Sequence, residues 1–249
     1  RQSIGNFSEK SAQTKFGTPN QSFDCFIKKK TLNKFFYYRF FMSNLVLNMA
    51  IDTSGQPYDT IYVGLITIKT DQLNKFEKEF RGKFPKFYRY KEKGAKRSAS
   101  ELKSIISFMN EKSFIKMYTI SLNNKEWVDL KSDYKGVSYF IEKAYSLIYS
   151  YLFTRVCWKY KPYNAIICEE SYLDINRVIE YCNFLNKSLN RNIVLSKGNA
   201  SINFLIRMAD FVASSHRKVD KDYLEKLERY QIYRLKDINY SLVNKIFKK

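Results

Sequence analysis

The sequence predicts a mixed α/β fold: a five-stranded sheet that begins as an antiparallel hairpin, continues with parallel strands and is flanked by helices. Two features predict this fold. The apolar, β-branched runs at residues 45–51 and 60–68 are joined by a short turn-rich segment, which is typical of an antiparallel hairpin. Further along the chain, short apolar runs alternate with segments of helical periodicity, which is typical of parallel strands joined by right-handed crossovers.

The individual elements follow from local patterns. The first strand runs into the turn sequence D-T-S-G-Q-P, which ends it. We expect the later strands at residues 114–122, 163–168 and 192–196. Apolar side chains recur at helical spacing in the segments between strands, and we expect helices at residues 71–80, 99–111, 136–158, 172–190 and 200–217.

Composition divides the chain into three segments. Residues 1–41 are polar, then basic, then aromatic, and we interpret them as an appendage or an upstream extension of the reading frame. Residues 42–218 form the predicted sheet domain, with a helical, basic insertion at about residues 70–112. Residues 219–249 alternate charges with Leu, Ile and Tyr, so we expect a C-terminal helical extension there.

The chain is strongly basic, with a formal net charge of +20 over 249 residues. A charge of this size repels itself in a compact chain and is stabilised by a polyanion, so we expect nucleic acid, DNA or RNA, as the partner. An anionic membrane surface is the rival partner. The aromatic run at residues 35–51 is too short and too polar for a convincing membrane span.

The cysteines and the histidine exclude one class of site. The chain has four cysteines, none in a C-x-x-C pair, and one histidine, His216, so a zinc finger is excluded. Free cysteines in apolar surroundings are typical of a reducing compartment, and we expect a cytoplasmic protein.

Three acidic residues fall where a mixed sheet would bring them together. Asp52 follows the first strand, Glu169 follows the fourth, and Asp210 lies on the apolar face of the last domain helix. Glu170 is the alternative to Glu169, because strand parity is uncertain by one residue, and Glu142 is a candidate fourth ligand. Carboxylates without histidine or cysteine favour Mg²⁺ or Mn²⁺, and we predict a two-metal site for phosphodiester chemistry.

Each of these carboxylates has an ordinary structural alternative. Asp52 could be a turn residue that binds its own backbone, and Glu169 could be a solvated strand end. Asp210 could form a structural ion pair with Arg207 or Arg217. The functional interpretation rests on the topology, which lets the separate residues converge.

A basic, aromatic segment at residues 83–97 is the predicted nucleic-acid contact, because cations neutralise phosphates while aromatic rings stack on bases. The alternative is a solvated loop whose aromatic side chains turn into the core. The candidate residues are Lys86, Tyr88, Arg89, Tyr90, Lys91, Lys93, Lys96 and Arg97.

Two short motifs resemble one known family. The D-T-S-G sequence at 52–55 is similar to the D-E-S-G signature of the RNase H-like proteins grouped as domain-of-unknown-function family 3800. The R-M-A-D sequence at 207–210 resembles the family's Q-x-A-D in its last helix, and Glu169 occupies the place of an aspartate. The resemblance covers roughly residues 44–217 and implies an RNase H-like fold with metal-dependent chemistry on nucleic acid.

These observations together predict a metal-dependent nuclease or related phosphodiester-cleaving enzyme in which Asp52, Glu169 and Asp210 are catalytic. The alternative is a catalytically inactive nucleic-acid-binding protein on the same fold. A third interpretation is a structural subunit whose basic, aromatic surfaces bind protein.

Overall fold

The structure is a computed structural model that describes residues 47–90, 93–156, 163–191, 193–238 and 240–248. The predicted appendage at residues 1–41 lies outside this part of the chain. The described residues belong to one compact unit.

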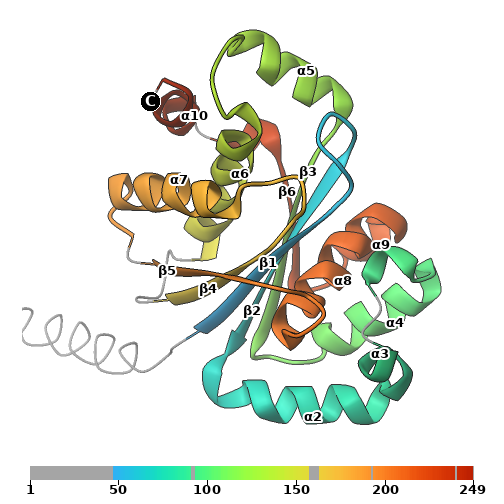
Figure 1. Ribbon diagram of the computed structural model, residues 1–249. Coiled ribbons are helices and arrows are strands. Elements are labelled where there is room, and N and C mark those ends of the chain that lie inside the picture. Colours follow the sequence, from blue (N-terminus) through green and yellow to red (C-terminus); the bar gives the residue numbers. More distant parts are fainter. Residues whose placement is uncertain (1–46, 91–92, 157–162, 192, 239, 249) are drawn as a thin grey trace, which may run out of the picture. The chain divides into compact units, whose positions relative to one another are not determined.

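A six-stranded sheet forms the centre of the unit (Figure 1). Its strand order is β5-β4-β1-β2-β3-β6, and β2 is antiparallel to both β1 and β3 while the other neighbours are parallel. The strands are β1 (Leu47–Ser54), β2 (Ile61–Lys69), β3 (Ile115–Leu122), β4 (Tyr163–Cys168), β5 (Ile193–Gly198) and β6 (Tyr230–Arg234). The predicted mixed α/β sheet is confirmed.

The predicted number of five strands is wrong, because β6 adds a sixth beside β3. This strand comes from residues 219–249, where the sequence pattern predicts helices only. Its residues are mostly half-buried or exposed, so the strand lacks the apolar alternation that marks the others.

Helices cover both faces of the sheet (Figure 1). One face carries α5 (Asn124–Asp133), α6 (Phe140–Val156), α7 (Ile175–Ser188) and α10 (Tyr240–Phe247). The other carries α2 (Leu73–Lys83), α4 (Ala99–Asn110), α8 (Phe204–Lys218) and α9 (Lys221–Glu225). The short helix α3 (Pro85–Tyr90) and the 3-10 turns η1 (Thr70–Gln72), η2 (Gly94–Lys96) and η3 (Leu235–Asp237) complete the described elements. None of the described helices is long and apolar enough to cross a membrane.

Helix α8 packs directly across β1 and β2, and Gly64 on β2 permits this close approach. A Cβ atom at Gly64 would lie 2.4 Å from the backbone nitrogen of Ala213 and 2.5 Å from the carbonyl oxygen of Ala209. Gly64 is also the register partner of Asp52 in the β1–β2 hairpin. The absence of a side chain at position 64 therefore brings the α8 turn that carries Asp210 over the end of β1.

Candidate metal centre

Asp52 lies near the carboxyl end of β1, in the centre of the sheet. Ile51 is paired with Ile167 of the parallel strand β4, so Asp52 and Cys168, the next residues, lie at the same level of the two strands. The Asp52 side chain is buried, with 4% of its surface exposed, and its Oδ1 accepts a hydrogen bond of 2.7 Å from the backbone N–H of Thr53. A buried carboxylate at this position requires a cation or a proton to offset its charge.

Two further side chains from the end of β4 meet Asp52. One carboxylate oxygen of Asp52, one of Glu170 and the sulfur of Cys168 all lie within 4.8 Å of one another. Glu170 is held from the other face of β1, where the Thr53 hydroxyl donates to its Oε1 at 3.1 Å. Tyr172 extends this network, because its hydroxyl lies 3.3 Å from the Thr53 hydroxyl.

Asp210 approaches from α8. Its negative charge acts on both Asp52 and Glu170, although its carboxylate is not one of the described ligand atoms that lie within 4.8 Å of one another. Its Oδ2 accepts a hydrogen bond of 2.6 Å from the backbone N–H of Gly94, and its Oδ1 accepts one of 3.1 Å from the Ser214 hydroxyl. Asn203 caps the helix by accepting from the backbone N–H groups of residues 205 and 206, which fixes where α8 begins. The Asp210 carboxylate is thus held in place by the helix itself and by the basic insertion.

The electrostatics of this cluster favour a bound cation. Burial raises the pKa of Asp52 well above its usual range, and the negative charges of Asp210 and Glu170 raise it further. Burial also raises the pKa values of Glu170 and Asp210, opposed in part by the positive charge of Lys93. Three carboxylates that repel one another in a water-poor place fit a hard divalent cation with oxygen ligands.

Cys168 adds a softer donor to this oxygen-rich cluster. Burial raises the pKa of its thiol, and the charges of Asp52 and Glu170 raise it further, so the thiol stays protonated beside them. The sequence offers one signal for this residue, since Cys168 directly precedes the acidic pair at the end of a strand. A hard cation prefers oxygen ligands, so the Cys168 thiol lies beside the proposed metal position without being required as a ligand.

The structure does not bring Glu169 or Glu142 into the cluster. The Glu169 backbone N–H donates to Gly198 at 2.9 Å, which extends the β4–β5 ladder by one residue. Its half-exposed side chain forms an ion pair of 3.6 Å with Lys197. Glu142 is half-buried in the first turn of α6, and neither carboxylate is among the ligand atoms that gather around Asp52 in the described residues.

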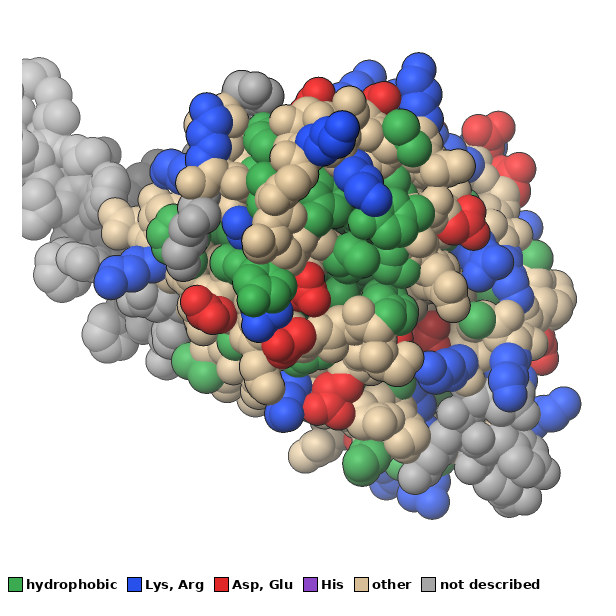
Figure 2. All heavy atoms as spheres, turned by 45° about the horizontal axis from the view of Figure 1, so that its top comes forward, with side chains coloured by type: hydrophobic (Ala, Val, Ile, Leu, Met, Phe, Trp, Pro, Cys, Tyr) green, Lys and Arg blue, Asp and Glu red, His purple; other side chains and the backbone are tan. Residues whose placement is uncertain are grey.

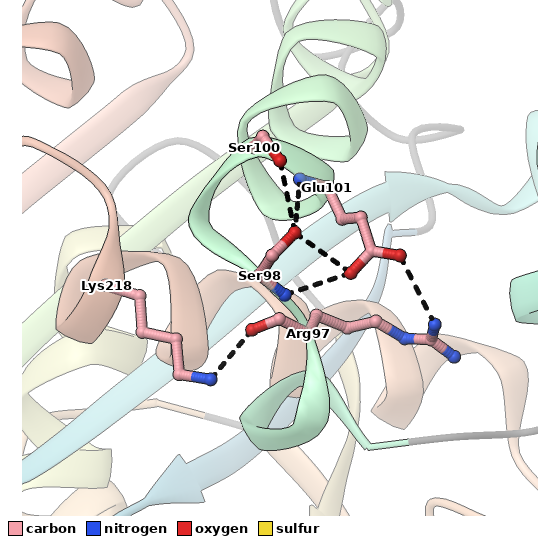
Figure 3. Close-up of polar contacts among 5 residues, drawn as sticks. All are labelled: Arg97, Ser98, Ser100, Glu101 and Lys218. Carbon is pink, nitrogen blue, oxygen red and sulfur yellow. Dashed lines mark hydrogen bonds and ion pairs between the residues drawn. The ribbon is translucent and has the colours of Figure 1, made fainter.

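The basic insertion is docked on α8 rather than standing free. Lys218 of α8 donates from Nζ to the carbonyl oxygens of Ala95 and Arg97, at 2.6 Å and 2.7 Å. Arg97 is buried; its guanidinium carbon lies 4.2 Å from the ring centroid of Phe87, and its Nη1 forms an ion pair of 3.7 Å with Glu101 (Figure 3). Together with the Gly94 hydrogen bond, these contacts connect the insertion to the candidate metal ligand Asp210.

The remaining predicted nucleic-acid contacts are placed unequally. Lys86, Lys93 and Lys96 are exposed, whereas the half-buried Tyr88 donates from its hydroxyl to Glu77 at 2.7 Å. Lys91 and the side chains of Arg89 and Tyr90 lie outside the described part. Figure 2 shows a face on which hydrophobic side chains form a connected central area and basic side chains are spread around it. Positive charge on this face is therefore spread around the hydrophobic area and is not gathered in one patch.

Comparisons of the whole chain with known proteins give structural similarity alone. No protein-family model and no curated protein matches the sequence, so the resemblance to family 3800 stays a prediction. The chain is similar to Bst-RNase HIII in complex with Mn²⁺, with 15% identity and a TM-score of 0.48 over 76% of this chain and 56% of that one.

Two further solved structures are similar at about the same level. The ribonuclease H2 of Pyrococcus horikoshii OT3 has 13% identity and a TM-score of 0.46, over 73% of this chain and 75% of that one. The RNase HII in the PCNA:RNase HII complex of Archaeoglobus fulgidus has 11% identity and a TM-score of 0.45, over 70% of this chain and 71% of that one. The chain spans little more than half the length of Bst-RNase HIII.

Proposed function

We propose that this chain is a metal-dependent nuclease or a related phosphodiester-cleaving enzyme, in which Asp52, Glu170 and Asp210 hold Mg²⁺ or Mn²⁺. One observation carries the proposal: the buried Asp52 and the half-buried Glu170 meet at the end of the central strands, with the buried Asp210 close enough for its charge to act on Asp52, and burial and the two neighbouring charges raise the pKa of Asp52. Glu170 takes the role predicted for Glu169, because its oxygen lies beside Asp52 while Glu169 pairs with Lys197.

The residues of this chain prepare the site before any cation binds. The Thr53 hydroxyl holds Glu170, and the Gly94 N–H and the Ser214 hydroxyl hold Asp210, so both side chains are fixed in advance. A divalent cation in such a site supplies Lewis acidity and lowers the pKa of bound water. The carboxylates thereby provide the oxygen ligands that this chemistry needs.

Nucleic acid is the proposed substrate. The chain carries a net charge of +20, and the exposed Lys93 is close enough to the cluster that its charge lowers the pKa values of Glu170 and Asp210. A backbone phosphate at the carboxylates would approach Lys93, which would offset part of its negative charge. Membership of family 3800 and a cytoplasmic location are part of the same proposal.

The test is cleavage by Asp52→Asn compared with Glu169→Gln. Asparagine keeps the shape of Asp52 but removes its charge, so we expect Mn²⁺-dependent cleavage of labelled DNA and RNA to fall at least a hundredfold, by order of magnitude for a lost metal ligand. Glu169→Gln removes a carboxylate next to the site and should cleave like the wild type. Thermal unfolding of both variants checks that each is folded.

Wild-type cleavage by Asp52→Asn would refute the assignment, and loss of cleavage in Glu169→Gln alone would move the metal ligand back to Glu169. Both proteins are purified alongside the wild type, so a contaminating nuclease would appear in all three preparations.

A catalytically inactive nucleic-acid-binding protein is the second candidate. The observation that favours it is the hydrogen bonding of Asp210, because both of its carboxylate oxygens already accept hydrogen bonds, one from Gly94 and one from Ser214. This alternative predicts salt-sensitive binding that is the same in wild type and Asp52→Asn, with no cleavage by either. Measurable cleavage by the wild type alone would exclude it.

A further inference from the structure

A hollow of about 290 Å³ lies between α2 and α3, on the insertion and apart from the carboxylate cluster. Its lining is polar and mostly charged, and consists of Asn74, Glu77, Lys78, Arg81 and Tyr88. Lys78 and Arg81 are three residues apart on α2, so both project from one face of that helix. The hollow therefore presents two cations side by side at the surface.

The ring of Tyr88 organises this group of cations. The guanidinium carbon of Arg81 lies 4.9 Å from the ring centroid, and that of Arg207 lies 5.3 Å from it. The Tyr88 hydroxyl donates to Glu77 at 2.7 Å, which fixes the ring and engages the only carboxylate in the lining. Two guanidinium groups from different helices are thereby held next to one aromatic ring.

Glu77 is the one acidic residue in the lining, and its charge acts on Arg207, but it forms no ion pair with the cations around the hollow. In the described part of the chain, none of Lys78, Arg81 and Arg207 forms an ion pair. Arg207 is only 6% exposed, and its Nε and Nη1 have no hydrogen-bond partner among the described residues. A buried guanidinium with unsatisfied donors is costly, and an anion in the hollow, on which Tyr88 also borders, would offset part of its positive charge.

We propose that this hollow binds a backbone phosphate of nucleic acid, at a point on the strand away from the bond that is cleaved. The inference rests on the proposed function, because it takes the same polymer as substrate. Lys78 supplies a point charge and Arg81 a planar fork for the phosphate oxygens, while Tyr88 holds the fork in place.

The hollow and the carboxylate cluster are connected through helix α8. Arg207, whose guanidinium lies beside the Tyr88 ring, precedes Asp210 by three residues on α8, so these two positions are about one helical turn apart and the same helix contacts the hollow and carries a candidate metal ligand. Contacts to phosphates fix the register and orientation of a nucleic acid without reading its sequence. The hollow thus sets which phosphodiester reaches the carboxylates.

The test is equilibrium binding of a fluorescein-labelled single-stranded oligonucleotide to the full chain in EDTA, where cleavage cannot occur. We expect Lys78→Gln and Arg81→Gln to weaken binding by about three- to tenfold at low salt and to lower the slope of log K against log salt by about 1. Lys75→Gln is the matched control, since Lys75 is an exposed lysine of the same helix outside the lining. It should change affinity less than about twofold.

Equal losses in all three variants would overturn the proposal, because they would reflect general charge alone; unchanged affinity in Lys78→Gln and Arg81→Gln would overturn it too. The two experiments distinguish failure of the proposed phosphate site from failure of the proposed nuclease activity. Weaker binding by Lys78→Gln combined with wild-type cleavage by Asp52→Asn would retain the phosphate site and remove the proposed metal chemistry. Loss of cleavage in Asp52→Asn with unchanged binding by Lys78→Gln would do the reverse.

Discussion

Gly64→Ala tests whether close packing of α8 on β2 creates the carboxylate cluster. The added methyl would lie 2.4 Å from the backbone nitrogen of Ala213 and 2.5 Å from the carbonyl oxygen of Ala209. Both atoms belong to the helix backbone, so no side chain can rotate away from the methyl group. Helix α8 must therefore withdraw from the sheet by about half an ångström or more before the contacts become tolerable.

The expected loss of stability follows from that contact. Overpacking a well-packed core costs about 1–3 kcal/mol, and a clash with backbone on both sides places Gly64→Ala in the upper half of that range. Withdrawal of α8 also takes Asp210 away from Asp52, which faces Gly64 across the hairpin. We expect urea unfolding to give a free energy about 2–3 kcal/mol below wild type, and calorimetry to give Mn²⁺ binding weakened by about tenfold.

Gly82→Ala is the control, because it adds the same methyl group to helix α2 where nothing lies within 4 Å. Alanine is the better helix former, so this variant should be more stable by up to about 1 kcal/mol, with unchanged Mn²⁺ binding. An unfolding free energy for Gly64→Ala within about 0.5 kcal/mol of wild type would refute the proposed packing constraint.

Two further predictions concern pH. In EDTA the wild type should lose stability relative to Asp52→Asn as the pH rises above about 4, because a carboxyl whose folded pKa is raised stabilises the fold only while it is protonated. Urea unfolding from pH 4 to 8, with and without Mn²⁺, measures the two free energies of unfolding. A difference between them that does not change with pH contradicts the prediction. Burial and the charge of Lys221 lower the pKa of His216 to about 4. The folded protein therefore holds the neutral ring, and the free energy of unfolding should fall as the pH drops from the ordinary histidine pKa toward 4, where the unfolded chain binds the proton more readily. His216 is the only histidine, so one NMR resonance reports its titration, and a midpoint near 6.5 would show that the ring is solvated.

The parts of the fold that local patterns determine could be predicted from the sequence. The hairpin of β1 and β2 is marked by two apolar runs and a turn, and α8 is marked by its apolar face, so both were expected in the correct order. Strand β6 was not predicted. Only Tyr230 of its five residues is buried, so the strand lacks the regular alternation of buried and exposed side chains that marks the other strands. An edge strand paired on one side carries a weak pattern of this kind.

The choice between Glu169 and Glu170 depends on where the β4–β5 ladder ends. The backbone N–H of Glu169 still donates to Gly198, so the chain leaves the ladder one residue later than the apolar run suggests. A shift of one residue exchanges the side chain that pairs with Lys197 for the one that lies beside Asp52. Sequence periodicity cannot resolve a single residue at the end of a strand.

The docking of the insertion on α8 could not be read from the sequence either. The hydrogen bond from Gly94 to Asp210 joins residues 116 positions apart, and it depends on the shape of both segments. Composition identified the insertion as basic and aromatic, but Arg97 is buried against Phe87 and does not face solvent. Charge content alone does not distinguish a cation that holds a loop from one that meets a phosphate.

Strand β6 determines which strand forms one edge of the sheet. It pairs with β3 from Met117 to Ser121 and so covers backbone N–H and C=O groups that would otherwise form an open sheet edge. Open edges recruit strands from other molecules and lead to aggregation. A protein shortened at residue 218, the predicted end of the domain, would expose that row of groups along β3. With β6 in place the edge of the sheet is a strand of five residues, Tyr230–Arg234, in place of the eight residues of β3, and a shorter edge offers fewer groups to a strand of another copy.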